Sequence, residues 1–453
     1  MTSEGQAPER SSIRQVVAAS FIGTTIEWYD FFLYGTAAAL VFNKLFFPKA
    51  EPSSGTLLAL ATYGVGFAAR PFGGIIFGHF GDRVGRKTML VLSLLIMGVA
   101  TFCIGLMPTY AAIGIWAPVL LVVLRIAQGI GVGGEWGGAV LMSVEHAPEG
   151  RRGFFGSWPQ MGVPAGLFLS TVVFLIVQET TSDEAFLSWG WRVPFLLSAI
   201  LIAVGMFVRL RLYESPAFQR VKDSGTEAPM PILDVLRKYP REVLLAMGMR
   251  LAENGTFYIL TVYVLVYGNE ELKLPKSTML WGVVIAALIG LVAIPFYGSL
   301  SDRVGRRPLY LGGAGFSLLF AFPFFLLLNT KSAVLIWLAI VLGVNVGHDL
   351  MYGPQGAYFA ELFGTRVRYS GASLGYQLAS VFAGGFAPLI AAALLKWAGW
   401  TAVASYMALM AAITVVATWL ASETYQSDIL ADDPRERDLA AGEAGEVRRE
   451  APA

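Results

Sequence analysis

The sequence predicts an all-α membrane protein with twelve transmembrane helices, arranged as two six-helix bundles with both termini in the cytoplasm. Of the 453 residues, 55% are hydrophobic and 14% are charged, and the mean hydropathy is +0.60. A soluble domain has about 45–50% apolar and about 25% charged residues. Apolar stretches long enough to cross a bilayer recur twelve times. In addition, loop motifs of the first half return in the second half.

Windows of about 20 apolar residues, the length that spans a bilayer, predict the positions of the helices. They lie near residues 14–42, 55–81, 88–107, 112–142, 154–178, 191–212, 243–268, 277–300, 308–328, 333–361, 370–396 and 399–421. The longest polar interruption divides them six and six. The expected parts are therefore a cytoplasmic tail over 1–13, an N-terminal bundle over 14–212, a central cytoplasmic loop over 213–242, a C-terminal bundle over 243–421 and a disordered cytoplasmic tail over 422–453.

The distribution of lysine and arginine predicts which helix ends face the cytoplasm. The loops that follow the even-numbered helices carry seventeen of these residues, with Arg209 and Arg211 among them. The loops on the opposite side carry seven. Because positively charged loops stay inside the cell, both termini are expected in the cytoplasm.

The strongest internal signal is a pair of repeated loops. "GHFGDRVGRK" after the second helix returns as "GSLSDRVGRR" after the eighth, and "EHAPEGRR" after the fourth helix is echoed by "ELFGTRVR" after the tenth. Transporters built from such repeats bind substrate near mid-membrane and rock one repeat against the other. We expect a cytoplasmic latch in which acids cap helix N-termini of the opposite half; the alternative is that the arginines serve topology alone. The latch candidates are Gly78, Asp82, Arg83, Gly85, Arg86, Glu145, Arg152, Asp302, Arg303, Gly305, Arg306, Glu361 and Arg368.

These loops resemble the best-known motif of the major facilitator superfamily, GxxxDRxGRK/R, which fits twice. Within that superfamily, "IEWYDFFLYG", "GFAARPFGG", "LRIAQGIGVGGEWGGA", "FLSWGWRVPF" and "ELFGTRVRYSGASLGYQ" resemble the metabolite:proton symporter family over nearly the whole chain. The resemblance implies twelve helices and proton-coupled uptake of a small metabolite. Members of the family carry proline and betaine, citrate, 2-oxoglutarate or shikimate. "SWGWR" and "HD" are most similar to shikimate-type members, and the tail lacks the heptads of the osmosensing ones.

Two acids, Glu27 and Asp30, interrupt the apolar first helix. A charge at that depth costs at least about 2.5–3.5 kcal/mol on insertion scales. Spaced three apart, the two acids share a helix face, and desolvation and mutual repulsion favour a proton on one of them. We expect at least one of them to carry the coupled proton. The alternative is that an acid pairs with a buried arginine and fixes the first helix.

The first half also supplies two buried cations, Arg70 and Arg125, the second within "LRIAQG", which resembles the fourth-helix motif of proton-coupled superfamily members. A guanidinium group offers a planar fork of donors that suits a carboxylate. Each arginine therefore either binds an anionic substrate or compensates a buried acid. Glu135, in the glycine-rich "GVGGEWGGA", is either a second proton site or an ion-pair partner, and Trp136 adds a flat aromatic surface to the substrate site.

The second half supplies candidates from three helices. Arg250 is three residues from Glu253, so it either forms a local ion pair or belongs to the substrate site. In "NVGHDLMYGPQG", Asp349 is a candidate proton carrier. His348 either relays protons or is a hydrogen-bonded packing residue. The neutral partners expected for the substrate are Asn254, Tyr376 and Gln377.

Several classes of function are excluded by the sequence. The net charge of +1, without a basic arm, argues against nucleic-acid binding. The single cysteine, Cys103, excludes an internal disulfide and a cysteine-built metal site. No HExxH, GxSxG or phosphate-loop pattern occurs. We therefore expect neither enzyme activity nor a cofactor or metal, and an ion gradient rather than ATP as the driving force.

The resulting prediction is a monomeric proton-coupled importer in a bacterial-type plasma membrane, with the bilayer, protons and a small metabolite as its partners. Buried Arg70, Arg125 and Arg250 favour an oxo-, hydroxy- or cyclic carboxylate. Four alternatives stay open: sodium as the coupling ion; a zwitterion such as proline or betaine, whose ammonium contacts Glu27 or Asp30 and an aromatic ring; a non-transporting sensor, for whose output domain the loop and tail leave no room; and export of a drug-like cation.

Overall fold

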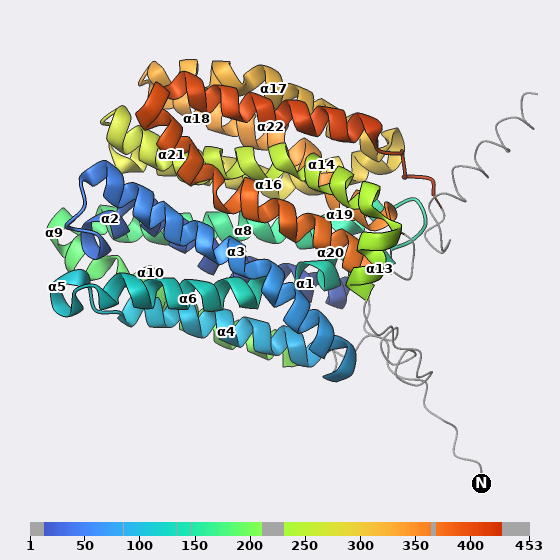
Figure 1. Ribbon diagram of the computed structural model, residues 1–453, viewed down its shortest axis with the longest axis horizontal. Helices are drawn as coiled ribbons and strands as arrows, with labels where there is room; N and C mark the ends of the chain where they lie inside the picture. Colours follow the sequence, from blue (N-terminus) through green and yellow to red (C-terminus); the bar gives the residue numbers. More distant parts are fainter. Residues whose placement is uncertain are drawn as a thin grey trace, which may run out of the picture.

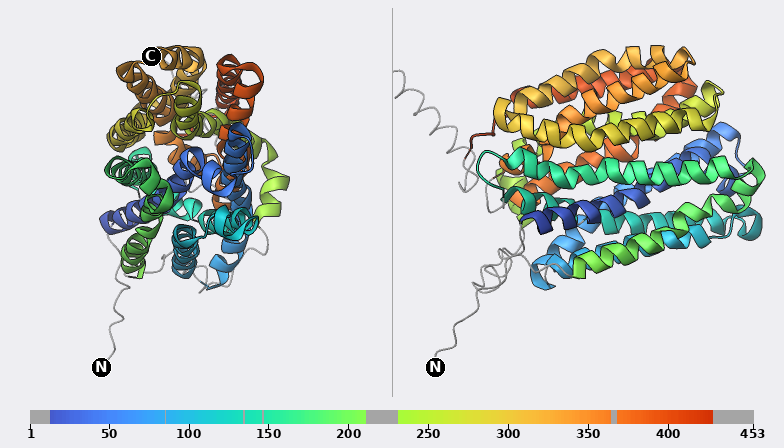
Figure 2. Two further views of the ribbon diagram at one scale, coloured as in Figure 1. Left: turned by 90° about the vertical axis from the view of Figure 1, so that its left-hand side faces the viewer. Right: turned by 180° about the vertical axis from the view of Figure 1, so that it is seen from behind.

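The computed structural model describes residues 13–84, 86–133, 135–145, 147–210, 231–363 and 368–427, and within these residues the chain is helical and has no strand. The helices run along the long axis of the molecule, with the N-terminal half (blue to green) beside the C-terminal half (yellow to red) (Figure 1). Seen along the helices, the two halves lie one above the other (Figure 2).

Helices of the N-terminal half are α1 (Ile13–Leu40), α2 (Phe42–Phe46), α3 (Pro52–Val84), α4 (Arg86–Leu106), α5 (Tyr110–Ile113), α6 (Trp116–Gly133), α7 (Trp136–Glu145), α8 (Arg152–Thr180), α9 (Asp183–Ala185), the π-helical turn η1 (Phe186–Gly190), α10 (Arg192–Leu196) and α11 (Ser198–Leu210). Those of the C-terminal half are α13 (Pro231–Lys238), α14 (Pro240–Tyr258), η2 (Ile259–Tyr263), α15 (Val264–Val266), η3 (Tyr267–Glu271), α16 (Lys276–Val304), α17 (Arg306–Asn329), α18 (Ala333–Val341), η4 (Leu342–His348), α19 (Asp349–Glu361), α20 (Arg368–Ala379), η5 (Ser380–Gly385), α21 (Ala387–Ala398) and α22 (Trp400–Leu420).

Grouped into rods, the described elements form the twelve long helices that the sequence predicts. The first half has α1, α3, α4, α6 with α7, α8, and α9 to α11. The second has α14 to η3, α16, α17, α18 to α19, α20 to α21, and α22. Eight of the described rods are long and apolar enough on their own to cross a membrane. Of the others, α1, α3 and α14 carry acids and arginines that belong to the buried charge clusters described below.

The outer surface of the bundle is apolar. Trp397 is 83% exposed, Leu319 78% and Val292 71%, and many other large hydrophobic side chains point outward. A soluble monomer rarely exposes apolar surface on this scale. These faces therefore lie against lipid, as the predicted membrane class requires.

Three predicted boundaries differ from the structure. The sixth rod begins at Asp183 rather than near residue 191, because the Ser182 side chain accepts a hydrogen bond from the Ala185 amide (3.2 Å) and starts a helix before the apolar window. The loop expected over 213–242 ends early, since α13 and α14 occupy most of its second part; residues 211–230 lie outside the described ones. The tail expected to be disordered over 422–453 begins with an ordered stretch, 422–427.

The helices α3 and α6 cross in backbone contact because glycines line their crossing. A Cβ added at Gly129 would overlap the carbonyl oxygen of Gly66, and one at Gly133 would overlap that of Arg70. Small residues allow such close approach between membrane helices. The crossing brings Arg70 of α3 and Arg125 of α6 against the same face of α1, where both stack on one phenylalanine ring.

The two halves contact each other on both sides of a central cavity. Helix α8 packs against α16 and α19, α7 against α19 and α20, α3 against η5 and α21, and α1 against η2 and α15. Three C-terminal rods change from α to π geometry near their middle, at η2, η4 and η5. Such turns are frequent at functional sites. Here η4 ends at His348 and η5 begins at Ser380, and both residues enter the polar network described below.

We predict that Gly129→Ala lowers the midpoint of thermal unfolding, because the added methyl group must push α3 away from α6 at a cost of about 1–3 kcal/mol. The matched control is Gly315→Ala in α17, where no atom lies within 4 Å of the added Cβ. Size-exclusion chromatography of heated, detergent-solubilised protein compares the two variants. Equal midpoints for both would contradict the packing assigned to the crossing.

Candidate functional site

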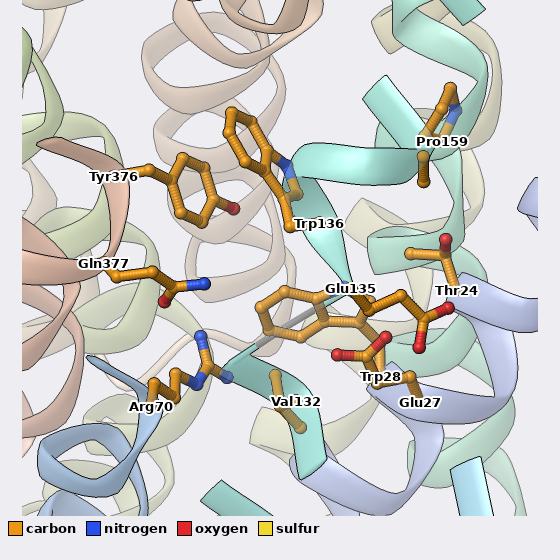
Figure 3. Close-up of a pocket in the computed structure, with 11 residues that line it drawn as sticks. Thr24, Glu27, Trp28, Arg70, Val132, Glu135, Trp136, Pro159, Tyr376 and Gln377 are labelled. Carbon is orange, nitrogen blue, oxygen red and sulfur yellow. The ribbon is translucent and has the colours of Figure 1, made fainter. Parts of the chain in front are cut away.

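A narrow cavity lies between the two halves, lined by α1, α3, α6, α7 and α8 of the first half and by α20 of the second (Figure 3). Its lining residues are Thr24, Glu27, Trp28, Arg70, Val132, Glu135, Trp136, Ala139, Pro159, Tyr376 and Gln377. Six of the site residues that the sequence predicts therefore meet in one place: Glu27, Arg70, Glu135, Trp136, Tyr376 and Gln377. The cavity is the candidate substrate site.

Arg70 brings a buried positive charge to this cavity. Its side chain is 1% exposed, and its guanidinium carbon lies 4.2 Å from the ring centres of Phe31 and Phe67 and 5.2 Å from that of Trp28. Among the described residues, no acceptor pairs with its Nε or Nη2 atoms. A buried donor without a partner is costly, so this guanidinium is suited to accept an anion.

Glu27 and Glu135 form a carboxyl pair at the same cavity, and Figure 3 shows their carboxyl groups facing each other. Two buried carboxyl groups that face each other either repel as two anions or share a hydrogen bond. Such a bond needs a proton on one of the two acids, because an ionised carboxylate only accepts. Arg209 of α11 donates to the Oε1 atom of Glu135. The pair and its arginine can therefore store one proton in a buried place.

Arg209 is a site residue that the sequence analysis missed. It was predicted to be a cytoplasmic loop charge, but it is only 4% exposed and lies inside α11. Its guanidinium passes beside Gly23 of α1, where a Cβ would approach its Nη2 to 2.9 Å. The predicted sixth helix extends to residue 212, which places Arg209 in its last turn. This was the only feature of the sequence that indicated burial.

Asp30 lies apart from Glu27, contrary to the expectation that the two acids repel each other on one face. Asp30 is 1% exposed and faces the hydroxyl of Thr101 in α4. Gln128 donates to that hydroxyl (2.7 Å) and accepts from the Nη1 atom of Arg125 (3.0 Å). Gln128 thus links Arg125 to the Thr101 hydroxyl that Asp30 faces, and that hydroxyl donates to the carbonyl oxygen of Met97 (3.0 Å).

Arg125 does not line the cavity but lies in an aromatic box beside it. Its guanidinium carbon is 4.1 Å from the ring centre of Phe31, 4.2 Å from that of Tyr34 and 4.9 Å from that of Tyr63. Its Nε and Nη2 atoms have no acceptor among the described residues, and no described carboxylate forms an ion pair with it. The direct pairing with an acid that the sequence left open is therefore absent here.

In the C-terminal half, Arg250 forms the local ion pair with Glu253 that the sequence offered as one alternative, at 2.7 Å. Its Nη1 atom also donates to Gln355 (2.9 Å), and its Nε atom donates to Ser380 (3.0 Å). Asp349 lies beside His348 in the same network. Neither Arg250 nor Asp349 is part of the cavity lining; Arg250 lies on the ring of Tyr376, which is part of it.

Asn254, also predicted for the substrate site, lies at the interface of the halves beside Gly384 and is 3% exposed. Its Oδ1 atom has no hydrogen-bond partner among the described residues. It is not part of the cavity lining.

An aromatic stack crosses from one half to the other at the cavity. The rings of Trp136 in α7 and Tyr376 in α20 lie 3.6 Å apart at 18°, and the Arg250 guanidinium covers the Tyr376 ring at 3.2 Å. Gln377 donates to the carbonyl oxygen of Gly133 across the same interface (3.2 Å). From this stack α7 runs on to Glu145, and α20 starts at Arg368, so the stack separates the cavity from that end of the molecule.

At that end, called the latch end below, Asp302 accepts hydrogen bonds from the amides of Gly153 (2.8 Å) and Phe154 (2.9 Å). These amides start α8 of the opposite half, so the carboxylate caps a helix N-terminus across the interface. Arg306 holds Asp302 (2.8 Å) and Glu361 (3.2 Å) together, and Arg152 approaches Glu361 to 3.9 Å.

For the remaining predicted latch residues, the structure shows no contact of this kind or describes only the backbone. Arg303 and Glu145 are exposed, and Gly305 breaks the rod between α16 and α17 with φ of +102°. Gly85 lies outside the described residues. The backbone is helical at the other positions, whose side chains are not described: Gly78, Asp82, Arg83, Arg86 and Arg368.

The start of the C-terminal tail completes the latch, which the sequence did not predict. Glu423 accepts from the backbone amides of Arg306 (2.9 Å) and Arg307 (3.0 Å) and so caps α17. Thr424 donates to Glu361 (2.7 Å). The Nη1 atom of Arg152, from the other half, donates to the carbonyl oxygen of Ser427 (2.8 Å). This short strap therefore joins the halves.

The opposite end is closed as well. Thr56 at the start of α3 donates to Glu270 in η3 (2.5 Å), and Phe386 packs against Gly64. With both ends in contact, the structure encloses the cavity between two sets of inter-half interactions.

Comparisons with known proteins agree with this fold. The family model for the Major Facilitator Superfamily matches residues 20–384. The shikimate transporter of Escherichia coli (strain K12) is 45% identical over 88% of this chain and 92% of its own length. The inner membrane metabolite transport protein YhjE of the same organism is 44% identical over 91% and 95%, and its proline/betaine transporter is 36% identical over 85% and 78%.

Among solved structures, a proton:xylose symporter bound to 6-bromo-6-deoxy-D-glucose superposes with a TM-score of 0.73 at 19% identity, over 92% of this chain and 98% of that one. A partially occluded inward-open xylose transporter from E. coli gives 0.71 at 19% identity, over 92% and 99%. These two likenesses concern the fold. The predicted resemblance is confirmed by the family match and the close relatives: the chain belongs to the major facilitator superfamily and is a multi-pass membrane transporter rather than an enzyme.

Proposed function

We propose that this transporter imports a small organic anion together with a proton, by alternating access in the inner membrane of a bacterium. The observation that best supports this proposal is the charge balance of the N-terminal half. Among the described residues it buries three arginines and three acids: Arg70, Arg125, Arg209, Glu27, Asp30 and Glu135.

This balance makes binding of a proton and of an anion depend on each other. With all six groups ionised, the buried charges cancel. A proton on Glu27 leaves one net positive charge, and a monoanion beside Arg70 cancels it again. Because uncompensated charge inside the membrane is costly, proton and anion bind together more favourably than either binds alone, and the coupling is reciprocal.

The Glu27–Glu135 contact favours a proton over sodium as the coupling ion. A hydrogen bond between two carboxyl groups needs a proton, whereas sodium would need several oxygen ligands around it. Within the described residues, no group of three or more acidic, histidine or cysteine side chains is arranged to hold a metal ion.

Arg70 supports an organic acid as the substrate. Its two unpaired nitrogens fit the planar oxygens of a carboxylate, and Trp28, Phe31 and Phe67 restrict its movement. The 45% identical relative is named a shikimate transporter, and shikimate is a cyclic carboxylate. We therefore propose an oxo-, hydroxy- or cyclic carboxylate as the substrate class.

The second candidate is a zwitterion, which the name of the proline/betaine relative suggests. An ammonium group would need a free aromatic face and a free carboxylate. Here the Trp28 ring already lies against Arg70, and Glu27 contacts Glu135. Both observations favour the anion.

For alternating access, the two ends of the molecule must open in turn. We propose that the latch end faces the cytoplasm, because the loops there belong to the set with more arginine and lysine. Breaking the Asp302 cap and the Glu423 strap would free α8 from α16 and α17 and release substrate inward. Breaking the Thr56–Glu270 contact would open the outer side.

We predict that Glu27→Gln abolishes proton-driven accumulation of shikimate in proteoliposomes but leaves shikimate exchange intact, because the amide keeps the shape and loses the proton. The measurement is uptake of radiolabelled shikimate under an imposed inward proton gradient. Glu179→Gln, the same change at an exposed acid of α8, serves as the control. Accumulation by Glu27→Gln at the wild-type level would remove Glu27 from the coupling mechanism.

Arg70→Gln is expected to raise KM for shikimate about 10- to 100-fold, since a hydrogen bond to a charged group contributes about 1.5–3 kcal/mol. Arg237→Gln, at an exposed arginine of α13, is the matched control and should leave KM unchanged. Initial rates of shikimate, proline and betaine uptake distinguish the substrate classes. Uptake of betaine alone, insensitive to Arg70→Gln, would favour the zwitterion.

We expect Asp302→Asn and Glu423→Gln each to increase the fraction of molecules in which the latch end is open. Loss of a cap costs about 0.5–2 kcal/mol, or about a 2- to 30-fold shift. In a Cys103→Ser background, Ser157→Cys places a thiol at a fully buried position against Gly298 of α16, and its alkylation rate measures opening. Asp183→Asn at an exposed position is the control. Unchanged alkylation in both latch variants would contradict the latch and leave the arginines of these loops with a role in topology alone.

A further inference from the structure

A second cluster of buried charges lies in the C-terminal half, away from the Glu27–Glu135 pair. The Nη1 atom of Arg250 is 2.7 Å from Glu253 Oε2. The other oxygen of Glu253 is 3.2 Å from His348 Nε2, and His348 Nδ1 is 2.8 Å from Asp349 Oδ1. All four side chains are at most 2% exposed.

The cluster has one permanent cation and two carboxylates, so it is neutral only when it holds one additional proton. Among the described residues, the titratable groups that face it from other positions are phenols: Tyr258 of α14, Tyr297 of α16, Tyr310 of α17, Tyr352 of α19 and Tyr376 of α20. Phenols are neutral near neutral pH. The helices α7, α8 and α18 also pack against η4 or α19. In α7 and α8 the acidic and basic residues lie at the helix ends, and α18 has none.

The geometry of the His348 ring identifies where that proton lies. A neutral imidazole has one N–H donor, whereas an imidazolium has two. Both ring nitrogens lie within hydrogen-bond distance of a carboxylate oxygen. Gln355 donates to the Oε2 atom of Glu253 (2.9 Å), and Asn345 donates to the Oδ2 atom of Asp349 (2.7 Å). Each carboxylate is thus held as an acceptor, so a ring that is protonated at both nitrogens satisfies both contacts.

Aromatic side chains shield this ring from water. The ring centre of Phe257 is 4.3 Å from that of His348, and the centre of Tyr352 is 4.8 Å away. Loss of the proton would leave one hydrogen bond unmade and one net negative charge in an enclosed site. The closed structure therefore favours the protonated cluster.

The cluster is connected to the aromatic stack between the halves. Arg250, held by Glu253 and Gln355, lies on the Tyr376 ring. Tyr376 lies on Trp136 of the other half. The charge state of the cluster therefore acts on the guanidinium that supports the contact between α20 and α7.

We propose that Glu253, His348 and Asp349 form a second proton-binding site, which holds His348 as an imidazolium and keeps the Trp136–Tyr376 contact closed at the latch side of the cavity. When that side opens, water reaches the cluster, its negative charge is solvated and the proton leaves. The closed state binds one more proton than the open state, so a rise in pH favours opening. This inference deepens the proposed transport function, but it depends neither on the substrate nor on Glu27.

The direct test is nitrogen NMR of histidine-labelled protein in lipid nanodiscs, without substrate. The chain has three histidines, and His348→Gln identifies the signals of His348 by their loss. Near neutral pH we expect both ring nitrogens of His348 to be protonated. Glu253→Gln should reduce this protonation, because one of the two acceptors of the imidazolium is lost. One protonated and one unprotonated nitrogen in the wild-type protein at this pH would overturn the proposal.

The second test measures the link to opening, again without substrate. In the Cys103→Ser background, spin labels at Glu149→Cys, in the loop between α7 and α8, and at Val304→Cys, the last residue of α16, occupy exposed positions of the two halves at the latch end. The measured quantity is the distance between the two labels, which is longer in the open state. If opening releases one proton from the cluster, the ratio of open to closed molecules should rise with pH by at most about tenfold per pH unit. His348→Gln should weaken this dependence, and it should weaken it as much in a Glu27→Gln background as in the background with Glu27 intact.

Comparison of His348→Gln with Glu27→Gln shows which half of the protein holds the proton that governs opening. A His348→Gln protein whose populations titrate like those of the wild type would contradict the proposed control of the Trp136–Tyr376 contact. If the pH dependence is lost only in Glu27→Gln, the proton that governs opening belongs to the N-terminal half, and the second site is refuted while the proposed transport function stands.

Discussion

A charge inside a membrane helix needs a compensating charge within the protein, because neither lipid nor water is available at that depth to solvate it. This constraint organises the centre of the molecule. Three arginines balance three acids in the N-terminal half, but the partners are not distributed evenly. Arg209 binds Glu135 directly, and Arg125 is linked through Gln128 to the Thr101 hydroxyl that Asp30 faces. Arg70 stacks on aromatic rings, and its Nε and Nη2 atoms have no acceptor among the described residues. The net balance is therefore kept while one guanidinium remains available for an anion.

In the C-terminal half, the buried charges are compensated in a different way. Apart from the Arg306–Glu361 pair at the latch end, its buried charges within the described residues are one arginine and two carboxylates, and the difference is made up by a histidine placed between the carboxylates. Because a histidine changes its charge near physiological pH, neutrality in this half depends on proton occupancy, whereas in the first half it depends on both proton and anion. Arg250 then connects this electrostatic condition to a mechanical one, since it supports the ring that closes the cavity.

Much of this arrangement could be predicted from the sequence, and the failures have physical causes. Hydropathy located the twelve rods because each must bury its backbone polar groups in lipid, and six of the predicted site residues line one cavity. Arg209 was missed because the inside-positive pattern assigns any arginine near a helix end to the surface, and only the space beside Gly23 shows that it folds inward. Glu423 was missed because its role depends on the free amides at the start of α17, more than a hundred residues earlier in the chain. Contacts of that kind leave no local pattern.

The spacing of Glu27 and Asp30 shows why a shared helix face is not a shared environment. Three residues correspond to a rotation of about 300°, and therefore to an offset of about 60° between the two side chains. In a tightly packed bundle that offset is enough to direct Glu27 into the cavity and Asp30 toward Thr101 of α4. One acid therefore sits where the two halves separate, and its surroundings change when the cavity opens. The other sits inside a single half, where rocking of the halves leaves its neighbours in place. Only the first position lets a change of access alter proton affinity, which is why Glu27, rather than Asp30, is suited to couple a proton to transport.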